Sequence, residues 1–305
     1  MKKTYAKAKN SSLKFIDLFA GIGGFHLAFQ KAGARCVFVS EWDKYARMTY
    51  EKNFRKTEPD LFDEGYFAGD ITKVVPQAIP DFDILAAGFP CQPFSHAGFK
   101  KGFADRRGTL FHDIVRIIEE KKPSAIFLEN VSHLLKHDDG KTFQVIKKTI
   151  EEELGYSFHY QLVRASDFGL PQHRPRLFMV GFRNKSIKFD FPKPIPLKKT
   201  MSDIFGGKCE KKIGYTLRVG GRGSGIHDRR NWDSYVVDGK VKRLTPKEGK
   251  RMQGFPEDFI FPVSEVQAMK QLGNSVAVSA IYAVAQEIVN TLLTHAKRKQ
   301  RGVGP

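Results

Sequence analysis

Strand-like and helix-like stretches alternate along the chain from residue 15 to residue 182. Short runs rich in apolar residues predict buried strands, and runs whose apolar residues recur every three or four positions predict helices. Strands are expected at 15–19, 36–42, 82–88, 125–130, 158–165 and 176–182, and helices at 25–33, 44–54, 109–121 and 142–154. This order is typical of an α/β fold whose doubly wound sheet carries helices on both faces.

The pattern changes at about residue 185, where proline, lysine and glycine replace the periodic stretches. The glycines of 219–225 predict a loop, because glycines at this density dissolve regular structure. Helical periodicity returns after 244–255, and a helix at 276–293 carries four apolar residues on one face, Ile281, Ala285, Ile288 and Leu292. The sequence therefore predicts a large domain at 1–184, a small inserted domain at 185–243, and a return to the large domain at 244–305.

The net charge of +18 is unevenly distributed. Residues 183–251 hold 19 Lys and Arg against 7 Asp and Glu, and the C-terminal KRKQR adds a second basic patch. A positive field of this size favours a polyanionic partner such as a nucleic acid, with a solvated basic surface as the alternative.

Cysteine usage and hydropathy argue against two classes of protein. Cys36, Cys91 and Cys209 are widely spaced, which indicates a reducing compartment without disulfides or a zinc site. We find no apolar run that approaches a membrane span, and the basic N-terminus lacks the apolar core of a signal peptide. A cytoplasmic protein without a membrane partner is expected.

The stretch GFPCQPFS at 88–95 sets a thiol, Cys91, between Pro90 and Pro93. Prolines this close exclude a helix interior, so Cys91 is expected on a stiff loop that leaves the strand at 82–88. Ligands bind at the carboxyl ends of strands in open α/β sheets. We interpret Cys91 as a thiol used in chemistry, with a buried structural cysteine as the alternative.

The stretch FIDLFAGIGG at 15–24 predicts a strand, a glycine-rich turn and a helix, and Glu41 follows Gly21 by twenty residues. This arrangement is typical of a nucleotide site, in which the acid bonds the ribose hydroxyls. His26 stands where the dinucleotide fingerprint needs its third glycine, which argues against a pyrophosphate. An adenosine ligand without phosphates, such as S-adenosylmethionine, stays open, and so does a tight strand–helix turn without a ligand.

Nine short motifs follow one another over nearly the whole length of the chain: FIDLFAGIGGF, EWDKYA, GDIT, GFPCQPFS, RGTLF, ENV, QHRPR, RLTPKEGKRMQGFP and QLGNSVAV. In this order they resemble the motifs of the bacterial DNA cytosine-5 methyltransferases. The resemblance implies a Rossmann-like S-adenosylmethionine-dependent methyltransferase sheet with a small inserted target-recognition domain. Double-stranded DNA would lie between the two lobes.

The resemblance also implies a chemistry for this chain. The thiolate of Cys91 would add to carbon 6 of cytosine, because carbon 5 is too weak a nucleophile to take a methyl group unaided. Glu129 of ENV would protonate N3, and Arg176 would bind the cytosine carbonyl. Arg174 would act behind Arg176 or contact a phosphate. Surface salt bridges are the alternative for both arginines.

Thirteen residues are implied to hold the cofactor, S-adenosylmethionine, which leaves as S-adenosylhomocysteine. They are Phe19, Ala20, Gly21, Ile22, Gly24, Glu41, Trp42, Asp70, Ile71, Pro90, Leu110, Asn274 and Ser275. Phe19, Trp42, Asp70 and Ile71 would surround the adenine. The family usually has proline where Ala277 stands, a departure that removes no polar contact.

Enzymes of this type flip the target base out of the duplex. The basic, glycine-punctuated segment 95–107 resembles the family's mobile loop, and the small domain should read the DNA sequence, with arginine as the usual partner of guanine. The candidate DNA contacts are Ser95, His96, Lys100, Lys101 and Arg106 in the loop, and Thr216, Arg218, Arg222, Arg229, Arg230 and Asn231 in the small domain.

Rival functions fit the sequence less well. An amino-group methyltransferase would have no use for the thiol of PCQP, and an inactive DNA-binding homologue would not need Cys91, Glu129 and Arg176. A cytosine-5 enzyme acting on transfer RNA stays open. No metal is expected, although His133 and His137 have helical spacing. We further expect a monomer, associated with the nucleoid of a bacterium. Two roles stay open: protection of a site that a restriction endonuclease also recognises, without contact between the two enzymes, and gene regulation.

Overall fold

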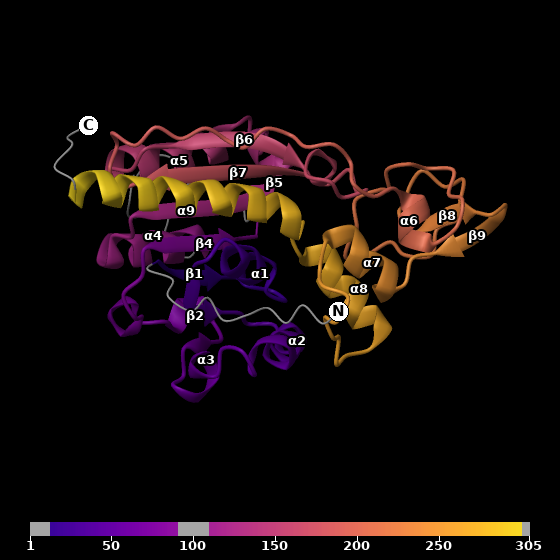
Figure 1. The fold of residues 1–305 in the computed structure, drawn as a ribbon, viewed down its shortest axis with the longest axis horizontal. Coiled ribbons are helices and arrows are strands. Elements are labelled where there is room, and N and C mark those ends of the chain that lie inside the picture. Colours follow the sequence, from indigo (N-terminus) through magenta and orange to yellow (C-terminus); the bar gives the residue numbers. More distant parts are fainter. Residues whose placement is uncertain (1–12, 91–109, 301–305) are drawn as a thin grey trace.

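The computed structural model describes residues 13–90 and 110–300, with the side chains of 299 and 300 left aside. Figure 1 shows a large lobe built on a sheet and a smaller lobe beside it. Helices α7 and α8 lie between the sheet and the far end of the small lobe.

The large lobe is a seven-stranded sheet in the order β3-β2-β1-β4-β5-β7-β6. Five neighbouring strands pair in parallel, and β7 runs antiparallel to both β5 and β6. The strands are β1 (Lys14–Leu18), β2 (Arg35–Ser40), β3 (Phe67–Ala68), β4 (Ile84–Gly88), β5 (Ala125–Val131), β6 (His159–Arg164) and β7 (Pro175–Phe182). The predicted doubly wound α/β fold is confirmed.

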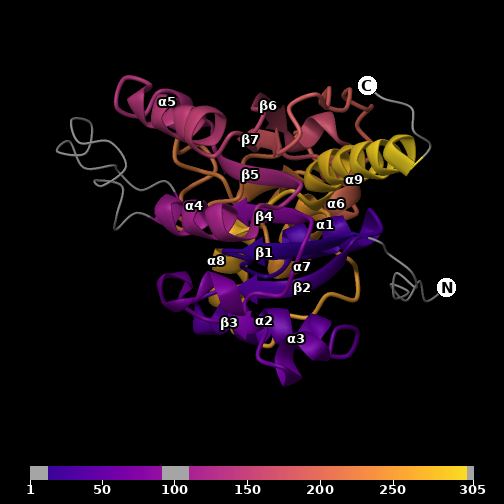
Figure 2. The same cartoon turned by 90° about the vertical axis from the view of Figure 1, so that its left-hand side faces the viewer.

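Helices cover both faces of this sheet, as Figure 2 shows. Helices α1 (Gly24–Lys31) and α9 (Val278–Gln300) lie on one face, and α4 (Leu110–Lys121) and α5 (Lys141–Lys148) lie on the other. Alternate residues of each strand enter opposite cores: Phe15 packs with the α1 side, and Ile16 packs with the α4 side. Because both faces are covered, the central strands are mostly apolar on both sides, apart from Asp17 in β1 and the residues Glu129 and Asn130 near the end of β5.

The large lobe contains one further long helix and several short elements. They are α2 (Lys44–Phe54), α3 (Asp60–Asp63), the 3₁₀ turns Ile71–Lys73, Pro76–Ala78, Ser132–Leu135 and Ala165–Asp167, and a π turn at Thr149–Glu153. The helix expected at 142–154 thus ends its α-helical part at Lys148 and continues as the π turn. The two-residue strand β3 was not predicted, because so short a run carries no period.

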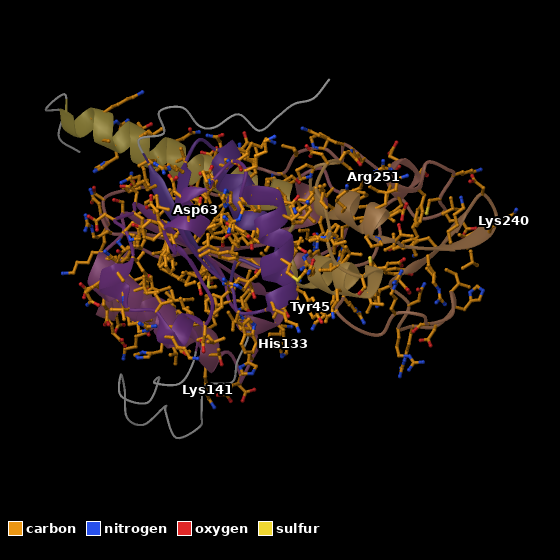
Figure 3. The ribbon with its side chains drawn as sticks, turned by 90° about the horizontal axis from the view of Figure 1, so that it is seen from below. Tyr45, Asp63, His133, Lys141, Lys240 and Arg251 are labelled. Atoms are coloured by element: carbon orange, nitrogen blue, oxygen red, sulfur yellow. The ribbon has the colours of Figure 1, made fainter. Side chains whose placement is uncertain are left out.

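The small lobe contains α6 (Met201–Phe205) and the hairpin of β8 (Ser234–Val237) and β9 (Lys240–Arg243). Helix α7 (Pro246–Gln253) packs on α6 and on α8 (Glu265–Asn274). In Figure 3, Lys240 marks the far end of this lobe, and His133 and Lys141 lie on the large lobe. Residues 219–225 form turns and bends, as predicted, whereas the hairpin was missed. The domain limits at 184 and 243 stay predictions.

Residues 265–298 correct one expectation, because by length and composition this helical region could cross a membrane. More than half of its most apolar window, 56%, is buried inside the protein, and Ile281, Ala285 and Ile288 are wholly buried. The apolar face expected for the last helix therefore packs against α1 and the sheet.

Candidate active site

The carboxyl ends of β4 and β5 bring an acid beside the expected thiol loop. Gly88 and Glu129 are register partners at these two ends. A Cβ at Gly88 would lie 3.3 Å from Glu129 Oε2, so the carboxylate lies directly over the last residue of β4. Glu129 is only 7% exposed, which removes most of the solvent that would compete for it.

Asn130 fixes the start of the loop that follows β4. Its buried Nδ2 donates to the carbonyl of Phe89 at 2.9 Å, and its Oδ1 accepts from the N–H of Val131 at 2.8 Å. Pro90, the next residue, is exposed. Cys91 itself lies outside the described residues, so its predicted role stays a prediction. Sequence reasoning gave Asn130 no role, although the ENV motif contains it.

Arg176, at the start of β7, forms an ion pair with the same acid. Its Nε lies 2.9 Å from Glu129 Oε1, and the two side chains are only 16% and 9% exposed. Sheet register explains the contact, because Arg176 pairs with Val131 on the neighbouring strand β5. The structure therefore brings together two of the predicted catalytic residues, and the expected alternative of a surface salt bridge does not describe this buried pair.

Arg174 lies only two residues earlier but has different surroundings. The residue is only 2% exposed, and its guanidinium donates to the carbonyls of Leu217 at 3.1 Å, Gly273 at 3.0 Å and Ser275. Burial, and then the charge of Arg176, lower the pKa of Arg174 well below its usual value. The suggested phosphate contact is incompatible with this burial, so of the two predicted roles only the one behind Arg176 remains a prediction.

The glycine turn and its acid meet as the spacing predicted. The N–H of Gly21 donates to Glu41 Oε2 at 2.7 Å, and the N–H of Asp43 donates to Oε1 at 2.8 Å. Burial raises the pKa of Glu41, while these two N–H groups pull it down. The carboxylate is thus held at the carboxyl end of β2, with its orientation fixed by backbone donors.

The α8–α9 turn closes the other side of the glycine turn. A Cβ at Gly24 would lie 2.5 Å from Val276 Cγ2 and 3.4 Å from Ser275 Oγ, so only glycine allows this approach. Ser275 is buried and Asn274 is exposed. Two predicted cofactor segments, separated by some 250 residues, are therefore in contact.

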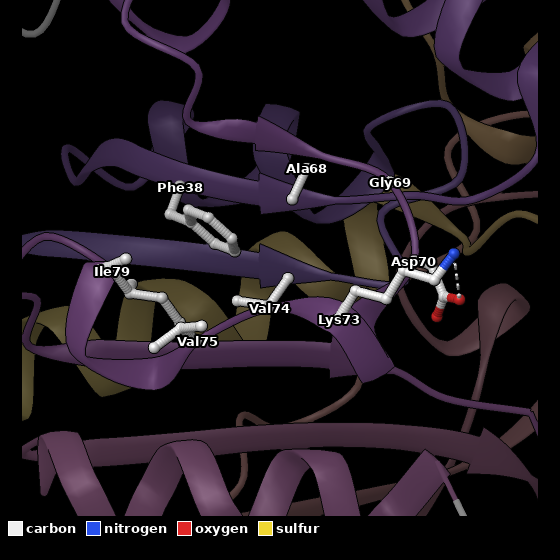
Figure 4. Close-up of a pocket in the computed structure, with 9 residues that line it drawn as sticks. Phe38, Ala68, Gly69, Asp70, Lys73, Val74, Val75 and Ile79 are labelled. Carbon is white, nitrogen blue, oxygen red and sulfur yellow. Dashed lines mark ion pairs between the residues drawn. The ribbon is translucent and has the colours of Figure 1, made fainter.

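An apolar hollow lies beside β2 and the turn after β3, as Figure 4 shows. Its described lining is Phe38, Ala68, Gly69, Asp70, Lys73, Val74, Val75, Ala78 and Ile79. Asp70 stands at one end, where Oδ1 accepts from the N–H of Thr72 and Oδ2 lies 4.0 Å from Lys73 Nζ. The hydroxyl of Thr72, which donates to Oδ1 at 2.8 Å, lowers the pKa of Asp70 most, followed by this N–H and the charge of Lys73. Among the predicted cofactor residues, Asp70 alone is part of this described lining.

The other predicted cofactor residues differ in burial. Ala20, Ile22 and Ile71 are buried, Phe19 and Leu110 are partly buried, and Trp42 is 83% exposed. An exposed tryptophan beside Glu41 offers a flat apolar surface to a ring. The glycine turn, its acid, the hollow and this ring form a set that fits an adenosyl group.

Two buried polar residues behind the glycine turn were not given a role by the sequence. Neither carboxylate oxygen of Asp17 has a hydrogen-bond partner among the described residues, and burial raises the pKa of Asp17 well above its usual value. His26 is stacked on Phe54 and bonds Tyr50 through Nδ1 at 2.5 Å. Burial lowers the pKa of His26 to about 3, so it is a neutral core residue.

The predicted DNA contacts fall into three groups. Ser95, His96, Lys100, Lys101 and Arg106 lie outside the described residues. Arg218 and Arg229 are exposed and form no ion pair with a described residue, and Thr216 is partly buried.

The remaining candidates already have partners inside the protein. Arg222 Nη2 donates to the carbonyl of Leu244 and pairs with Glu265 at 2.9 Å, while its Nε lies 3.6 Å from the wholly buried Asp233. Arg230 pairs with Asp228 at 2.7 Å. Asn231 is buried and bonds backbone carbonyls. Arg222 and Asn231 therefore shape the loop, and we do not retain them as DNA contacts.

His133 and His137 lie 6.2 Å apart between ring centroids, and His137 bonds Thr142. Within residues 13–90 and 110–300, no group of three His, Cys, Asp or Glu side chains could hold a metal ion. Of the described cysteines, Cys36 is buried and Cys209 partly so.

Comparison with known proteins adds the family. A family model described as C-5 cytosine-specific DNA methylase matches residues 13–219 and 216–290. The chain is 44% identical to the Type II methyltransferase M.SsoII of Shigella sonnei, over 94% of this chain and 83% of the relative. It is 40% identical to the Type II methyltransferase M.HhaI of Haemophilus parahaemolyticus, over 92% and 96%.

Solved structures share the fold. A DNMT2 mutant of Spodoptera frugiperda superposes with a TM-score of 0.69 at 21% identity, over 92% of this chain and all of the other. A prophage-encoded DNA modification methyltransferase of E. coli, itself described as putative, gives 0.68 at 20% identity, over 92% of this chain and 100% of that one.

Proposed function

Because the chain belongs to the C-5 cytosine-specific DNA methylases, we propose that it transfers the methyl group of S-adenosylmethionine to carbon 5 of a cytosine flipped out of double-stranded DNA. The observation that carries the proposal is the buried carboxylate of Glu129, which lies over Gly88 and is paired with Arg176. The carboxylate lies beside the carboxyl end of β4, the strand that precedes Cys91 in the sequence. This position supports a reaction in which a thiol and an acid act together.

The reaction divides among these side chains. The Cys91 thiolate forms a bond to carbon 6, and the ring electrons move toward N3, where the acid form of Glu129 delivers a proton. Arg176 donates to the cytosine carbonyl and keeps Glu129 oriented. Carbon 5 then takes the methyl group. Solvent water takes the hydrogen of carbon 5 as a proton, and the electrons of that C–H bond form the C5–C6 double bond as sulfur leaves carbon 6. N3 returns its proton to the Glu129 carboxylate. The enzyme thereby regains its thiolate.

S-adenosylmethionine supplies an electrophilic methyl group on a sulfonium. We propose that Glu41 bonds the ribose hydroxyls, because its carboxylate is held at the glycine turn by Gly21 and Asp43. Trp42 and the hollow that ends at Asp70 would hold the adenine. Ser275 and Gly24 would border the methionine part, since the two are in contact beside the site.

DNA would lie against the small lobe, whose exposed arginines Arg218 and Arg229 are free to contact it. Removing an arginine that contacts a phosphate weakens binding to all sequences, whereas removing one that contacts a base relaxes the sequence preference at that position. Mutation of Arg218 and Arg229 therefore shows which kind of contact each one makes. The role we propose is protection of one short DNA site, with an endonuclease that cuts the same site and does not contact this chain. A cytoplasmic monomer remains our expectation.

Methyl transfer from tritiated S-adenosylmethionine to unmethylated bacteriophage DNA tests the activity, and bisulfite sequencing of that DNA identifies both the base and its site. We expect cytosines converted to 5-methylcytosine at one short sequence. Cys91→Ser should abolish transfer, and Glu129→Gln should lower kcat by about 10²–10⁴-fold. Full activity of Cys91→Ser would rule out the covalent route.

A duplex with 5-fluorocytosine at the mapped position provides an independent test. Fluorine cannot leave as a proton does, so the bond between Cys91 and carbon 6 should persist as a complex that survives denaturant. Transfer RNA offered under the same conditions serves as the control substrate, since no observation favours it.

A further inference from the structure

The small lobe and the cofactor segments meet at one buried polar cluster. Both backbone groups of Leu217 are bonded by side chains from the segment before β7. The N–H of Leu217 donates to Gln172 Oε1 at 3.0 Å, and its carbonyl accepts from Arg174 Nη1 at 3.1 Å. Leu217 lies between Thr216 and Arg218, two of the predicted DNA contacts. Gln172 and Arg174, two residues apart in the chain, therefore fix the position of the segment that contains Leu217.

The same two side chains bond the other wall of the cluster. Arg174 donates to the carbonyls of Gly273 and Ser275, which flank Asn274 in the turn after α8. Gln172 Nε2 lies 3.2 Å from the carbonyl of Met252 and from Gln253 Oε1. Gln253 in turn donates to the carbonyl of Leu272 at 2.7 Å. One cluster thus joins the predicted DNA-contact segment, α7, the end of α8 and the α8–α9 turn.

Packing at the end of α8 gives independent support for this junction. A Cβ at Gly273 would lie 2.5 Å from both the carbonyl carbon and the oxygen of Arg218. Backbone therefore packs on backbone, at a distance that only glycine permits. The segment that carries Arg218 cannot shift toward α8, and the Asn274 turn cannot shift toward the segment, without a collision.

The cluster is also connected to the acid. Arg174 and Arg176 flank Pro175, and Arg176 pairs with Glu129. Gln172, Arg174 and Gln253 are all buried, and the guanidinium of Arg174 has no carboxylate partner among the described residues. A buried guanidinium that is stabilised only by hydrogen bonds to carbonyl groups depends on the positions of those carbonyls, because no water replaces a lost bond.

We propose that Arg174, with Gln172, is a positioning residue that couples DNA recognition to the cofactor turn. A DNA duplex that contacts residues 216–218 would hold the backbone of Leu217 in one position. Arg174 bonds the carbonyl of Leu217 and those of Gly273 and Ser275, so the α8–α9 turn would then be held in one position as well. Cofactor binding at the turn acts in the opposite direction, because coupling between two sites is reciprocal. Arg174 therefore contributes more to the coupling free energy between DNA binding and cofactor binding than to the affinity for either ligand alone.

The test is a binding cycle with S-adenosylhomocysteine and a duplex that carries the site identified by bisulfite sequencing. Calorimetry gives the Kd of each ligand alone and in the presence of the other. For the unmodified protein we expect S-adenosylhomocysteine to tighten duplex binding by about fivefold or more, within the usual range of coupling. In Arg174→Lys, whose ammonium lacks the planar fork, we expect less than about twofold coupling.

Kinetics separates positioning from general damage. Arg174→Lys should lower kcat by about tenfold or more, while the Kd of each ligand alone and the KM for DNA change by less than about threefold. Arg183→Lys is the matched control, because Arg183 also donates to a carbonyl, that of Lys122, on the exposed surface. It should keep the coupling and kcat of the unmodified protein.

Gly273→Ala reaches the same junction without touching Arg174, and it decides the matter if Arg174→Lys does not fold. Its new methyl group should push the Arg218 segment away and abolish the coupling. Normal coupling in either folded variant overturns the proposal. A duplex affinity that S-adenosylhomocysteine leaves unchanged in the unmodified protein overturns it too, even if methyl transfer is normal. A protein that fails to transfer methyl groups but retains coupled binding would instead contradict the proposed chemistry.

Discussion

The ion pair between Arg176 and Glu129 should stabilise the folded protein measurably. The two side chains are 2.9 Å apart at their closest atoms and are only 16% and 9% exposed. Two unit charges about 4 Å apart attract by about 4 kcal/mol at an effective dielectric constant of about 20. Removing one partner of a buried pair costs about 3–5 kcal/mol, because the other charge is left unpaired.

We therefore expect Arg176→Met to lower the free energy of unfolding by about 3 kcal/mol, and Glu129→Gln to have a similar effect. The double variant should be no less stable than either single variant, since neither charge is left without a partner. The coupling energy from this cycle should then be about 3 kcal/mol or more. Urea unfolding followed by circular dichroism, at pH 7 and without ligand, measures all four proteins.

Arg35 and Asp60 provide the matched control, because they are equally close, at 2.7 Å, but are 50% and 54% exposed. Solvent screens such a pair, so its coupling should lie between about 0 and 1 kcal/mol. A coupling for Arg176 and Glu129 that is no larger than the control value would refute the reasoning. It would mean that solvent reaches the acid in spite of its burial.

Three further predictions concern the cofactor site, the core and the small lobe. Gly24→Ala adds a methyl group that would lie 2.5 Å from the side chain of Val276, and it should weaken S-adenosylhomocysteine binding by about tenfold. Gly220→Ala is the control, because a methyl group there would lie in open space and should leave this affinity unchanged. Calorimetry measures the Kd of both variants. Burial lowers the pKa of His26 from 6.5 to about 3, so stability is fully present above pH 6.5 and falls as the pH drops toward 3. His26→Gln should reduce the slope of unfolding free energy between pH 6 and pH 4 by about 1.4 kcal/mol per pH unit, and an unchanged slope in urea titrations would contradict the assignment. Arg229→Ala should weaken DNA binding and reduce its dependence on salt concentration without changing the stability of the protein. Arg222→Met should instead lower the free energy of unfolding by about 3 kcal/mol, because it leaves the buried Asp233 without its ion-pair partner. Filter binding at several salt concentrations and urea unfolding distinguish the two variants.

Local patterns predicted much of the large lobe, because strands and helices repeat every 2 and about 3.6 residues. The strand limits at 125–130 and 176–182 differ from β5 and β7 by one residue at a single end. The small lobe was harder, since its hairpin has four-residue strands and β9 is exposed on both faces. A strand without a buried side carries no apolar alternation.

The sequence by itself determined the order of the elements, the glycine turn, the acid that faces it and the family to which the chain belongs. Each of these depends on residues that are close together or on motifs with a fixed order. Glu41 follows Gly21 by twenty residues, and its Oε2 lies 2.7 Å from the Gly21 nitrogen, because the chain between them forms one helix, α1, and one strand, β2, that returns to the same edge of the sheet.

Only the tertiary structure decided the fates of the two arginines of QHRPR. Strand β7 begins at Pro175, so Arg176 follows the register of the sheet and meets Glu129, while Arg174 precedes the strand and follows no period. Its partners, Leu217, Gly273 and Ser275, lie far along the chain and offer only backbone carbonyls. Every residue has such a carbonyl, and therefore no sequence pattern could indicate which of them a buried guanidinium would bind.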